Sequence, residues 1–153
     1  MASLPFAAGS FDTVLVATNT LFNLYTSEGQ LACVAESRRV LRLGGRLIIE
    51  AMVPAEDDAG LDRLVTTKSI TVDSAVLTAT IRESEAQVIT GQHIQITEAG
   101  IRLRPWKIRY ATPPQLDAMA NAAGLRHGER FADWSGEPWT DECPNAVSVY
   151  VAI

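Results

Sequence analysis

A strand–helix–strand pattern in the first third of the chain constrains the fold more than any other feature. The run 11–17 (FDTVLVA) is short, apolar and β-branched, which indicates a strand buried on both faces. Ser27 and Gln30 have capping-box spacing, which predicts a helix from Ser27 that ends at the glycine pair 44–45. The apolar run 46–53 predicts a second buried strand. Two strands joined through a helix pair in parallel, by a right-handed crossover.

The middle of the chain has the alternating pattern of antiparallel strands. Runs of alternating apolar and polar residues are separated by short polar turns, which predicts an antiparallel ribbon or small sheet inserted at 65–110. Pro105 lacks a backbone N–H, so its strand is expected at an edge or a bulge. The expected strands are 66–72, 76–83, 87–97 and 101–110.

The last third returns to mixed helix and strand. Thr112 and Gln115 have capping-box spacing, with proline at the first helical position. Gly124 is expected to end this helix. Strands are then expected at 126–134 and 146–153.

The composition is that of an ordinary globular protein, with 153 residues, 47% hydrophobic and 20% charged. We expect one domain over 1–153, carrying 65–110 as an inserted antiparallel subdomain. The net charge of −5 argues against nucleic-acid and anionic-membrane partners, and no apolar run approaches the roughly 20 residues that span a bilayer. Cys33 and Cys143 lack metal-ligand spacing, so we expect no metal and reduced thiols in a cytoplasmic protein.

Several segments, taken in order, resemble the second half of the class I S-adenosylmethionine (SAM)-dependent methyltransferases. Residues 4–14 (LPFAAGSFDTV) are similar to the run that enters the fourth strand of that family. Residues 39–47 (RVLRLGGRL) resemble the segment before its fifth strand, with Leu43 where proline is usual. Residues 112–125 resemble the helix before its sixth strand, and 146–153 would be its seventh, antiparallel strand.

The resemblance implies an α/β fold: a partial Rossmann-like methyltransferase sheet, with strands corresponding to the fourth to seventh, and an inserted antiparallel β ribbon or sheet. It also implies methyl transfer from SAM to a small-molecule acceptor. The family holds SAM in a glycine-rich turn, whereas none of the ten glycines here stand at G-x-G spacing. We therefore expect an incomplete SAM site in a truncated or split chain. The alternatives are a non-catalytic binding or subunit module derived from a methyltransferase, and an unrelated α+β binding domain.

The position of the first strand bears on assembly. Without the first three strands of the family, the apolar strand 13–17 would lie at a sheet edge. An open apolar edge invites pairing with another chain. We expect a homodimer or a swapped assembly through this edge.

The segment after the first strand is the candidate cofactor site, because open α/β sheets bind ligands at the carboxyl ends of parallel strands. By the resemblance, Tyr25 and Asn23 would lie nearer the acceptor. The alternative is an Asx turn with two core aromatics. The residues expected to border SAM are Thr18, Asn19, Thr20 and Phe22.

The candidate catalytic residues are Glu50, His93 and Tyr25. Glu50 stands in an otherwise apolar strand, so its carboxylate must be paired or must line the ligand crevice. An imidazole can act as a general base, so His93 is a candidate base over the active site; the alternative is a half-exposed strand histidine. His127 is expected at the surface.

A basic and aromatic cluster at 102–110 supplies further acceptor-binding candidates. Alternation places Arg104 and Trp106 on one face of their strand and Arg109 on the other. These residues could form a lid that stacks a flat acceptor and pairs with its carboxylate. The alternative is a solvated ribbon face with one buried aromatic.

Overall fold

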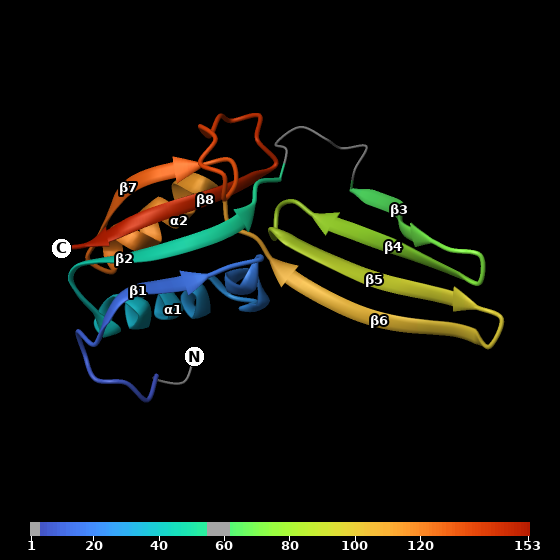
Figure 1. Cartoon of the computed structure of the whole chain (residues 1–153), viewed down its shortest axis with the longest axis horizontal. Helices are drawn as coiled ribbons and strands as arrows, with labels where there is room; N and C mark the ends of the chain where they lie inside the picture. Colours follow the sequence, from blue (N-terminus) through green and yellow to red (C-terminus); the bar gives the residue numbers. More distant parts are fainter. Residues whose placement is uncertain (1–3, 55–61) are drawn as a thin grey trace. The chain divides into compact units, whose positions relative to one another are not determined.

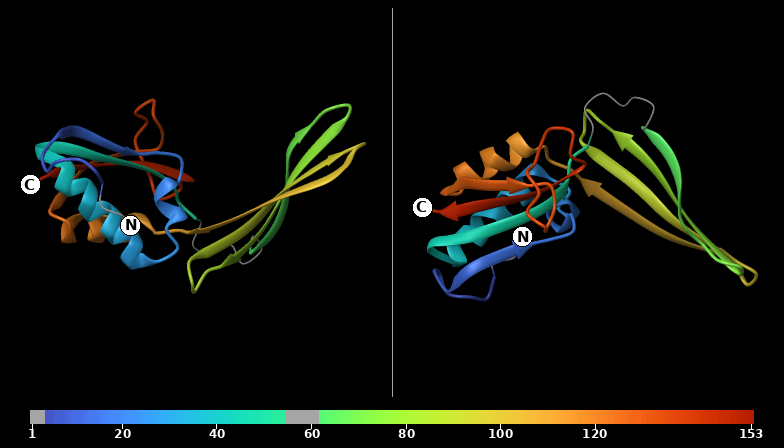
Figure 2. Two further views of the ribbon diagram at one scale, coloured as in Figure 1. Left: turned by 90° about the horizontal axis from the view of Figure 1, so that it is seen from below. Right: turned by 45° about the horizontal axis from the view of Figure 1, so that its top comes forward.

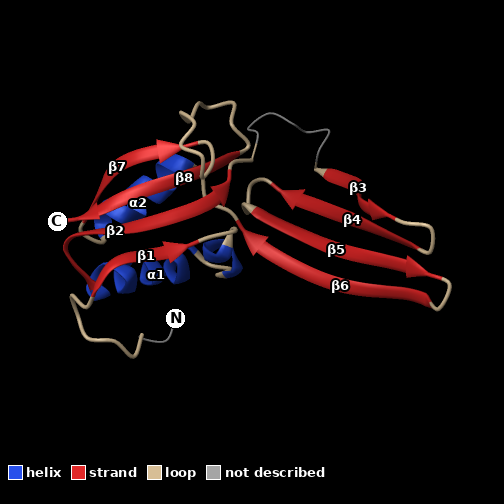
Figure 3. Cartoon of the chain, in the orientation of Figure 1, coloured by secondary structure: helices blue, strands red, loops and turns tan. Residues whose placement is uncertain are grey.

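The computed structural model describes residues 4–54 and 62–153, and the chain divides into two compact units (Figure 1). The α/β unit comprises Met1–Ala55 and Ala111–Ile153, and the β unit comprises Glu56–Tyr110. Strands form most of the β unit, and the helices belong to the α/β unit (Figure 3). None of these helices has the length and apolar character needed to cross a membrane. The elements are β1 (Phe11–Val16), η1 (Thr20–Asn23), α1 (Ser27–Val40), β2 (Leu41–Met52), β3 (Arg63–Ile70), β4 (Ser74–Glu83), β5 (Val88–Thr97), β6 (Gly100–Arg109), α2 (Pro113–Ala122), β7 (Leu125–Phe131) and β8 (Asn145–Ala152).

The sheet of the α/β unit has the order β1-β2-β8-β7. β1 pairs in parallel with β2, while β8 runs antiparallel to both β2 and β7. The predicted parallel pair is confirmed, and so is the predicted fold class, a partial Rossmann-like sheet with an inserted antiparallel sheet. Among the described residues, β1 is an edge strand, as expected.

Both helices lie on one face of this sheet (Figure 2). Alternate residues of β2 (Leu47, Ile49 and Ala51) are at most 2% exposed, as expected for side chains under the helices. The prediction that the first strand is buried on both faces is wrong, since Leu15 is 56% exposed. In the described part of the chain, no helix covers the other face of the sheet.

α1 begins at Ser27, as predicted, but its capping residue differs from the prediction. Thr26, not Ser27, is the N-cap, and its hydroxyl oxygen accepts a hydrogen bond from the Gly29 N–H at 3.0 Å. Gln30 is fully buried and its amide donates to the Leu24 carbonyl at 3.1 Å, which ties the helix to the preceding loop.

The predicted end of α1 at the glycine pair is wrong. The helix ends at Val40, and β2 begins at Leu41. Gly44 has a φ of +74°, which favours glycine, and it lies at an irregularity in the register of β1 with β2. The glycine pair therefore shapes the entry of β2 rather than the end of the helix.

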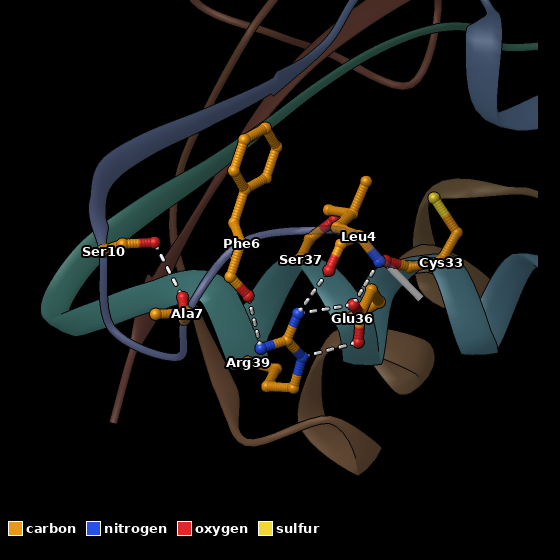
Figure 4. A network of polar contacts seen from close by, with 8 residues as sticks. All are labelled: Leu4, Phe6, Ala7, Ser10, Cys33, Glu36, Ser37 and Arg39. Atoms are coloured by element: carbon orange, nitrogen blue, oxygen red, sulfur yellow. Dashed lines mark hydrogen bonds and ion pairs between the residues drawn. The ribbon is translucent and has the colours of Figure 1, made fainter. Parts of the chain in front are cut away.

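The segment that precedes β1 is tied to α1 by a polar network (Figure 4). The Arg39 guanidinium donates to the carbonyls of Leu4 at 3.1 Å and Phe6 at 2.9 Å. Glu36 accepts from the Leu4 N–H at 2.7 Å and pairs with Arg39 at 2.7 Å. These hydrogen bonds hold the segment that precedes β1 against α1.

The predicted start and stop of α2 are confirmed. The Thr112 N–H donates to Gln115 Oε1 at 2.9 Å, as in a capping box. Gly124, just beyond the helix, has a φ of +80°.

The sheet of the β unit has the order β3-β4-β5-β6, and every pair is antiparallel. Its strands lie within three residues of the predicted bounds. Pro105 lies in β6, an edge strand, as predicted.

Candidate functional site

The loop after β1 has an unusual backbone. β1 and β2 are parallel neighbours, so this loop lies at the carboxyl ends of both strands. Thr18 and Asn19 both have left-handed conformations, with φ of 53° and 59°. This region costs a residue with a Cβ on the order of 1–2 kcal/mol. Consecutive strained residues of this kind persist only where the surroundings hold them, and they gather at ligand sites.

Hydrogen bonds from β2 hold the strained loop. The Thr18 N–H donates to Glu50 Oε2 at 2.7 Å, and the Asn19 N–H donates to the Glu50 carbonyl at 3.2 Å. The Met52 N–H donates to Asn19 Oδ1 at 2.6 Å. The sequence required Glu50 to be paired or to line a crevice, and its carboxylate is paired with the loop backbone beside the ends of the strands.

The remaining loop residues differ in exposure. Thr20 begins the 3-10 helix η1 and its hydroxyl donates to the Ala17 carbonyl at 2.5 Å. The Phe22 side chain is fully buried in the core, whereas Tyr25 is 58% exposed. The Asn23 amide donates to the Thr20 carbonyl at 3.3 Å. The structure thus brings Thr18, Asn19, Thr20 and Glu50 together and leaves the ring of Phe22 away from solvent.

A cavity of about 340 Å³ opens beside this loop. Its wall includes Val16 from β1, Thr20 and Asn23 from η1, and Cys33 from α1. The lining is mostly apolar. Burial raises the pKa of the Cys33 thiol, which keeps it uncharged at neutral pH. The position of Cys33 beside this cavity could not be predicted from the sequence, which indicated only that the residue lies in a helix.

The second group of candidates lies on the sheet of the β unit. His93 in β5 is opposite Thr78 in β4, with its Nδ1 3.0 Å from the threonine Oγ1. Arg104 in β6 is opposite His93 on the other side. The Trp106 ring lies 5.9 Å from the His93 ring, centroid to centroid. Three predicted residues therefore share one face of this sheet.

Two features of the β unit refine the predicted acceptor site. Arg109 alternates to the other face from Trp106 and donates to Gln87 Oε1 at 3.3 Å, so the structure does not gather it with the other candidates. Gly91 lies opposite Trp106, and a Cβ at Gly91 would come within 2.2 Å of the Trp106 ring. Sequence reasoning missed Gly91, although a glycine inside a strand signals a close approach.

His127 lies in β7 and differs from its prediction. Its ring is half-buried and packs edge-on against Tyr150, with centroids 5.7 Å apart, because the two strands are paired. Among the residues that the structure describes, no group of His, Cys, Asp or Glu is placed to hold a metal ion.

Comparisons with known proteins agree with this fold. A family model described as a methyltransferase domain matches residues 1–49. No curated protein matches the sequence significantly. The CcbJ methyltransferase from Streptomyces caelestis matches 98% of this chain with 33% identity and a TM-score of 0.91. A SAM-dependent methyltransferase from Clostridium acetobutylicum matches 99% of this chain with 8% identity and a TM-score of 0.82.

A third solved structure is a SAM-bound amino pentose methyltransferase from Micromonospora echinaspora, involved in calicheamicin biosynthesis. It matches the whole of this chain with 20% identity and a TM-score of 0.74. The chain spans 64%, 61% and 61% of the lengths of these three proteins.

The sheet order, the strained loop and these matches define the class: the chain has a methyltransferase fold. The resemblance drawn from the sequence is confirmed, since over nearly its whole length the chain is similar to the C-terminal portion of class I SAM-dependent methyltransferases of the small-molecule type.

Proposed function

We propose that this chain takes part in methyl transfer from SAM to a small-molecule acceptor. The observation that carries the proposal is the loop at the carboxyl ends of β1 and β2, where Thr18 and Asn19 are strained and held by β2. Ligands of open α/β sheets bind at this end. The similar proteins named above support the cofactor and the class of acceptor, and one of them was solved with SAM bound.

The residues present fit one part of SAM. The cavity beside the loop has apolar walls and an uncharged thiol, which suit the carbon skeleton of a ligand and its desolvation. When bound, SAM supplies an electrophilic methyl group on a sulfonium. Asn19 and Thr20 would border the cofactor, with Thr18 contributing backbone. Phe22 would act from the core by packing beneath η1.

Each unit carries its own acceptor-binding candidates. In this proposal these are Tyr25 and Asn23 in the α/β unit, and Arg104 and Trp106 in the β unit. Arg109 stays a prediction from the sequence, since it lies on the opposite face of the β-unit sheet from Trp106. His93 removes a proton where the acceptor is a protonated hydroxyl or amine. Glu50 acts mainly by holding the loop, because one of its carboxylate oxygens already accepts the Thr18 N–H.

The remaining sequence-based expectations stay part of the proposal. These are one domain over 1–153, a cytoplasmic location and a homodimer or swapped assembly through the β1 edge. The two cysteines are free thiols, which agrees with a reducing compartment. β1 is an edge strand of mostly exposed residues, which supports pairing there.

A second candidate function is a non-catalytic module. It is favoured by the lack of glycines at G-x-G spacing in this chain, since class I methyltransferases hold SAM in such a turn. The site that this chain supplies would then be only part of a cofactor site.

Calorimetry with SAM tests the proposal and separates the two functions. We expect a dissociation constant of about 1 mM, because the chain has no glycines at G-x-G spacing to hold the cofactor as class I methyltransferases do. Asn19→Ala should weaken binding further, since it removes the acceptor for the Met52 N–H. Asn121→Ala on α2 is the matched control and should leave the affinity unchanged. No binding at all would favour the non-catalytic module, and micromolar binding would show that the site is complete.

A further inference from the structure

The sheet of the α/β unit has helices on one face only. α1 and α2 lie on the face to which Leu47, Ile49 and Ala51 of β2 point, and these side chains are at most 2% exposed (Figure 2). In the part of the chain that the structure describes, the opposite face has no helix, and it is here called the open face. Ile48 and its β1 partner Leu15 point to the open face, because side chains alternate along a strand. Leu15 is 56% exposed.

The centre of the open face is apolar. Its central row crosses β1, β2 and β8, and the next row toward the carboxyl end of β2 adds one apolar residue each from β8 and β7. Sheets built on parallel strands are normally covered on both faces, since such strands carry apolar side chains on each side. The five apolar residues of the two rows are Leu15, Ile48, Val149, Val147 and Phe131.

The charged residues of the open face lie at its margins. Arg46 and Arg126 belong to the row nearer the amino ends of β2 and β7, where both are opposite Val151. Glu129 lies in β7, an outer strand of the sheet. The carboxylate of Glu50 already holds the loop after β1. An apolar centre with a polar rim is the usual arrangement of a protein–protein interface.

A cavity of about 230 Å³ hollows the open face near β7. Its lining includes Ile48 from β2, Val147 and Val149 from β8, and Phe131 from β7. Trp134, which follows β7, also lines the cavity and is 55% exposed. The cavity can accept an apolar side chain from a second polypeptide, which would bury the exposed tryptophan.

We infer that the open face docks a separate polypeptide, the N-terminal portion of a class I methyltransferase. This chain matches the CcbJ methyltransferase over 98% of its own length but spans only 64% of that protein, so about a third of such an enzyme has no counterpart here. A second copy of this chain that paired along the β1 edge would add a strand and leave the open face uncovered. The inference rests on the proposed function, because the docked portion is the one that would carry the glycine-rich turn for SAM.

The position of the open face connects docking with the candidate site. Glu50 lies on this face, near the carboxyl end of β2, and its carboxylate accepts the Thr18 N–H. A polypeptide that covers the open face therefore lies beside the strained loop of Thr18 and Asn19. It can supply the part of the SAM site that this chain does not contain.

Co-expression tests the inference. The chain, carrying an affinity tag, is produced together with the portion of the CcbJ methyltransferase that has no counterpart in it. We expect a one-to-one complex, whose dissociation constant is measured by sedimentation velocity over a dilution series. Leu15→Lys should raise this constant at least about tenfold, because it buries a charge, and Leu15→Ala should raise it by a smaller factor. Leu43→Lys is the matched control: it makes the same change at a residue that is 76% exposed, before the pairing of β2 with β8 begins, and should leave the complex intact.

Two outcomes would overturn the inference. One is the absence of a complex while circular dichroism shows the chain folded, and the other is an equal weakening by Leu15→Lys and Leu43→Lys.

Calorimetry with SAM separates this inference from the proposed function. The complex should bind SAM at least about tenfold more tightly than the chain alone. A complex that forms without any gain in SAM affinity would support the docking and contradict the proposed function. SAM binding by the chain alone, with no complex formed, would do the reverse.

Discussion

Tyr150 is the residue on which a buried polar network of the α/β unit converges. It is fully buried on β8, and its hydroxyl donates to Asp117 Oδ1 at 2.8 Å. Arg130 pairs with Asp117 at 2.6 Å and lies 3.3 Å from the Tyr150 hydroxyl oxygen. Burial, and then the nearby Asp117 carboxylate, raise the pKa of Tyr150. The network therefore ties α2 to β7 and β8 through an uncharged tyrosine.

Tyr150→Phe should change the dependence of stability on pH. The folded-state pKa lies above the unfolded value of about 10. The stabilisation is therefore complete below about pH 10 and is lost above it, at about 1.4 kcal/mol per pH unit. At pH 7 the variant should be less stable by about 1 kcal/mol, through the lost hydrogen bond. Urea unfolding at pH 7 and pH 11 measures both values.

Comparing the unfolding at pH 7 with the unfolding at pH 11 provides the control. The difference in the free energy of unfolding between the wild type and Tyr150→Phe should shrink or vanish at pH 11. Only the wild type has a buried phenol that must stay protonated in the folded state, so only the wild type loses stability for this reason as the pH rises. A difference that is constant from pH 7 to pH 11 would contradict the raised pKa.

At the scale of elements, the packing of β5 against β6 depends on a glycine, Gly91, in β5. Gly91 leaves room for the Trp106 ring to lie across the backbone of β5. A strand glycine has no side chain to pack, and here the neighbouring tryptophan fills that space. This packing sets the position of Trp106 beside His93.

Gly91→Ala should therefore destabilise the β unit. The new Cβ would lie 2.2 Å from the Trp106 ring, so the ring must move. Such overpacking costs on the order of 1–3 kcal/mol. Urea unfolding measures the loss, and tryptophan fluorescence reports the displaced ring. In a Trp106→Leu background the loss should largely disappear; an equal loss in both backgrounds would show that the clash is not with Trp106.

Much of the element pattern followed from the sequence, and the failures have physical causes. Apolar periodicity and turn residues predicted the parallel pair and the four antiparallel strands, because both signals are local. The cap of α1 was misplaced because Thr26 and Ser27 are both good caps, and only the geometry of the loop before them selects Thr26. Burial of β1 was misjudged because exposure depends on which elements cover each face.

In the candidate site, too, some features could be predicted from the sequence and others could not. The sequence predicted that Glu50 lies near the end of its strand and that its carboxylate needs a partner. The sequence did not predict that this partner is the Thr18 N–H. Thr18 has a left-handed backbone, and a residue other than glycine gives no sequence signal for that conformation. Gly91 and Cys33 depend on contacts between elements, which one sequence does not specify.

At the scale of the whole molecule, the chain contains two sheets that carry different groups of candidate site residues. The sheet of the α/β unit presents a strained loop at the carboxyl ends of its parallel strands. The sheet of the β unit carries the acceptor-site candidates His93, Arg104 and Trp106 on one face. The chain spans 64% of the CcbJ methyltransferase, so the activity of the whole enzyme is a proposal for this chain.

Backbone amide shifts of the ¹⁵N-labelled chain, recorded while SAM is added, test the central claim most directly. The claim is that the loop after β1 is the part of a SAM site that this chain supplies. The account predicts that the largest shifts fall on residues 18–25 and on Glu50, which holds the loop. Shifts confined to the β unit, or spread evenly over the chain, would contradict it.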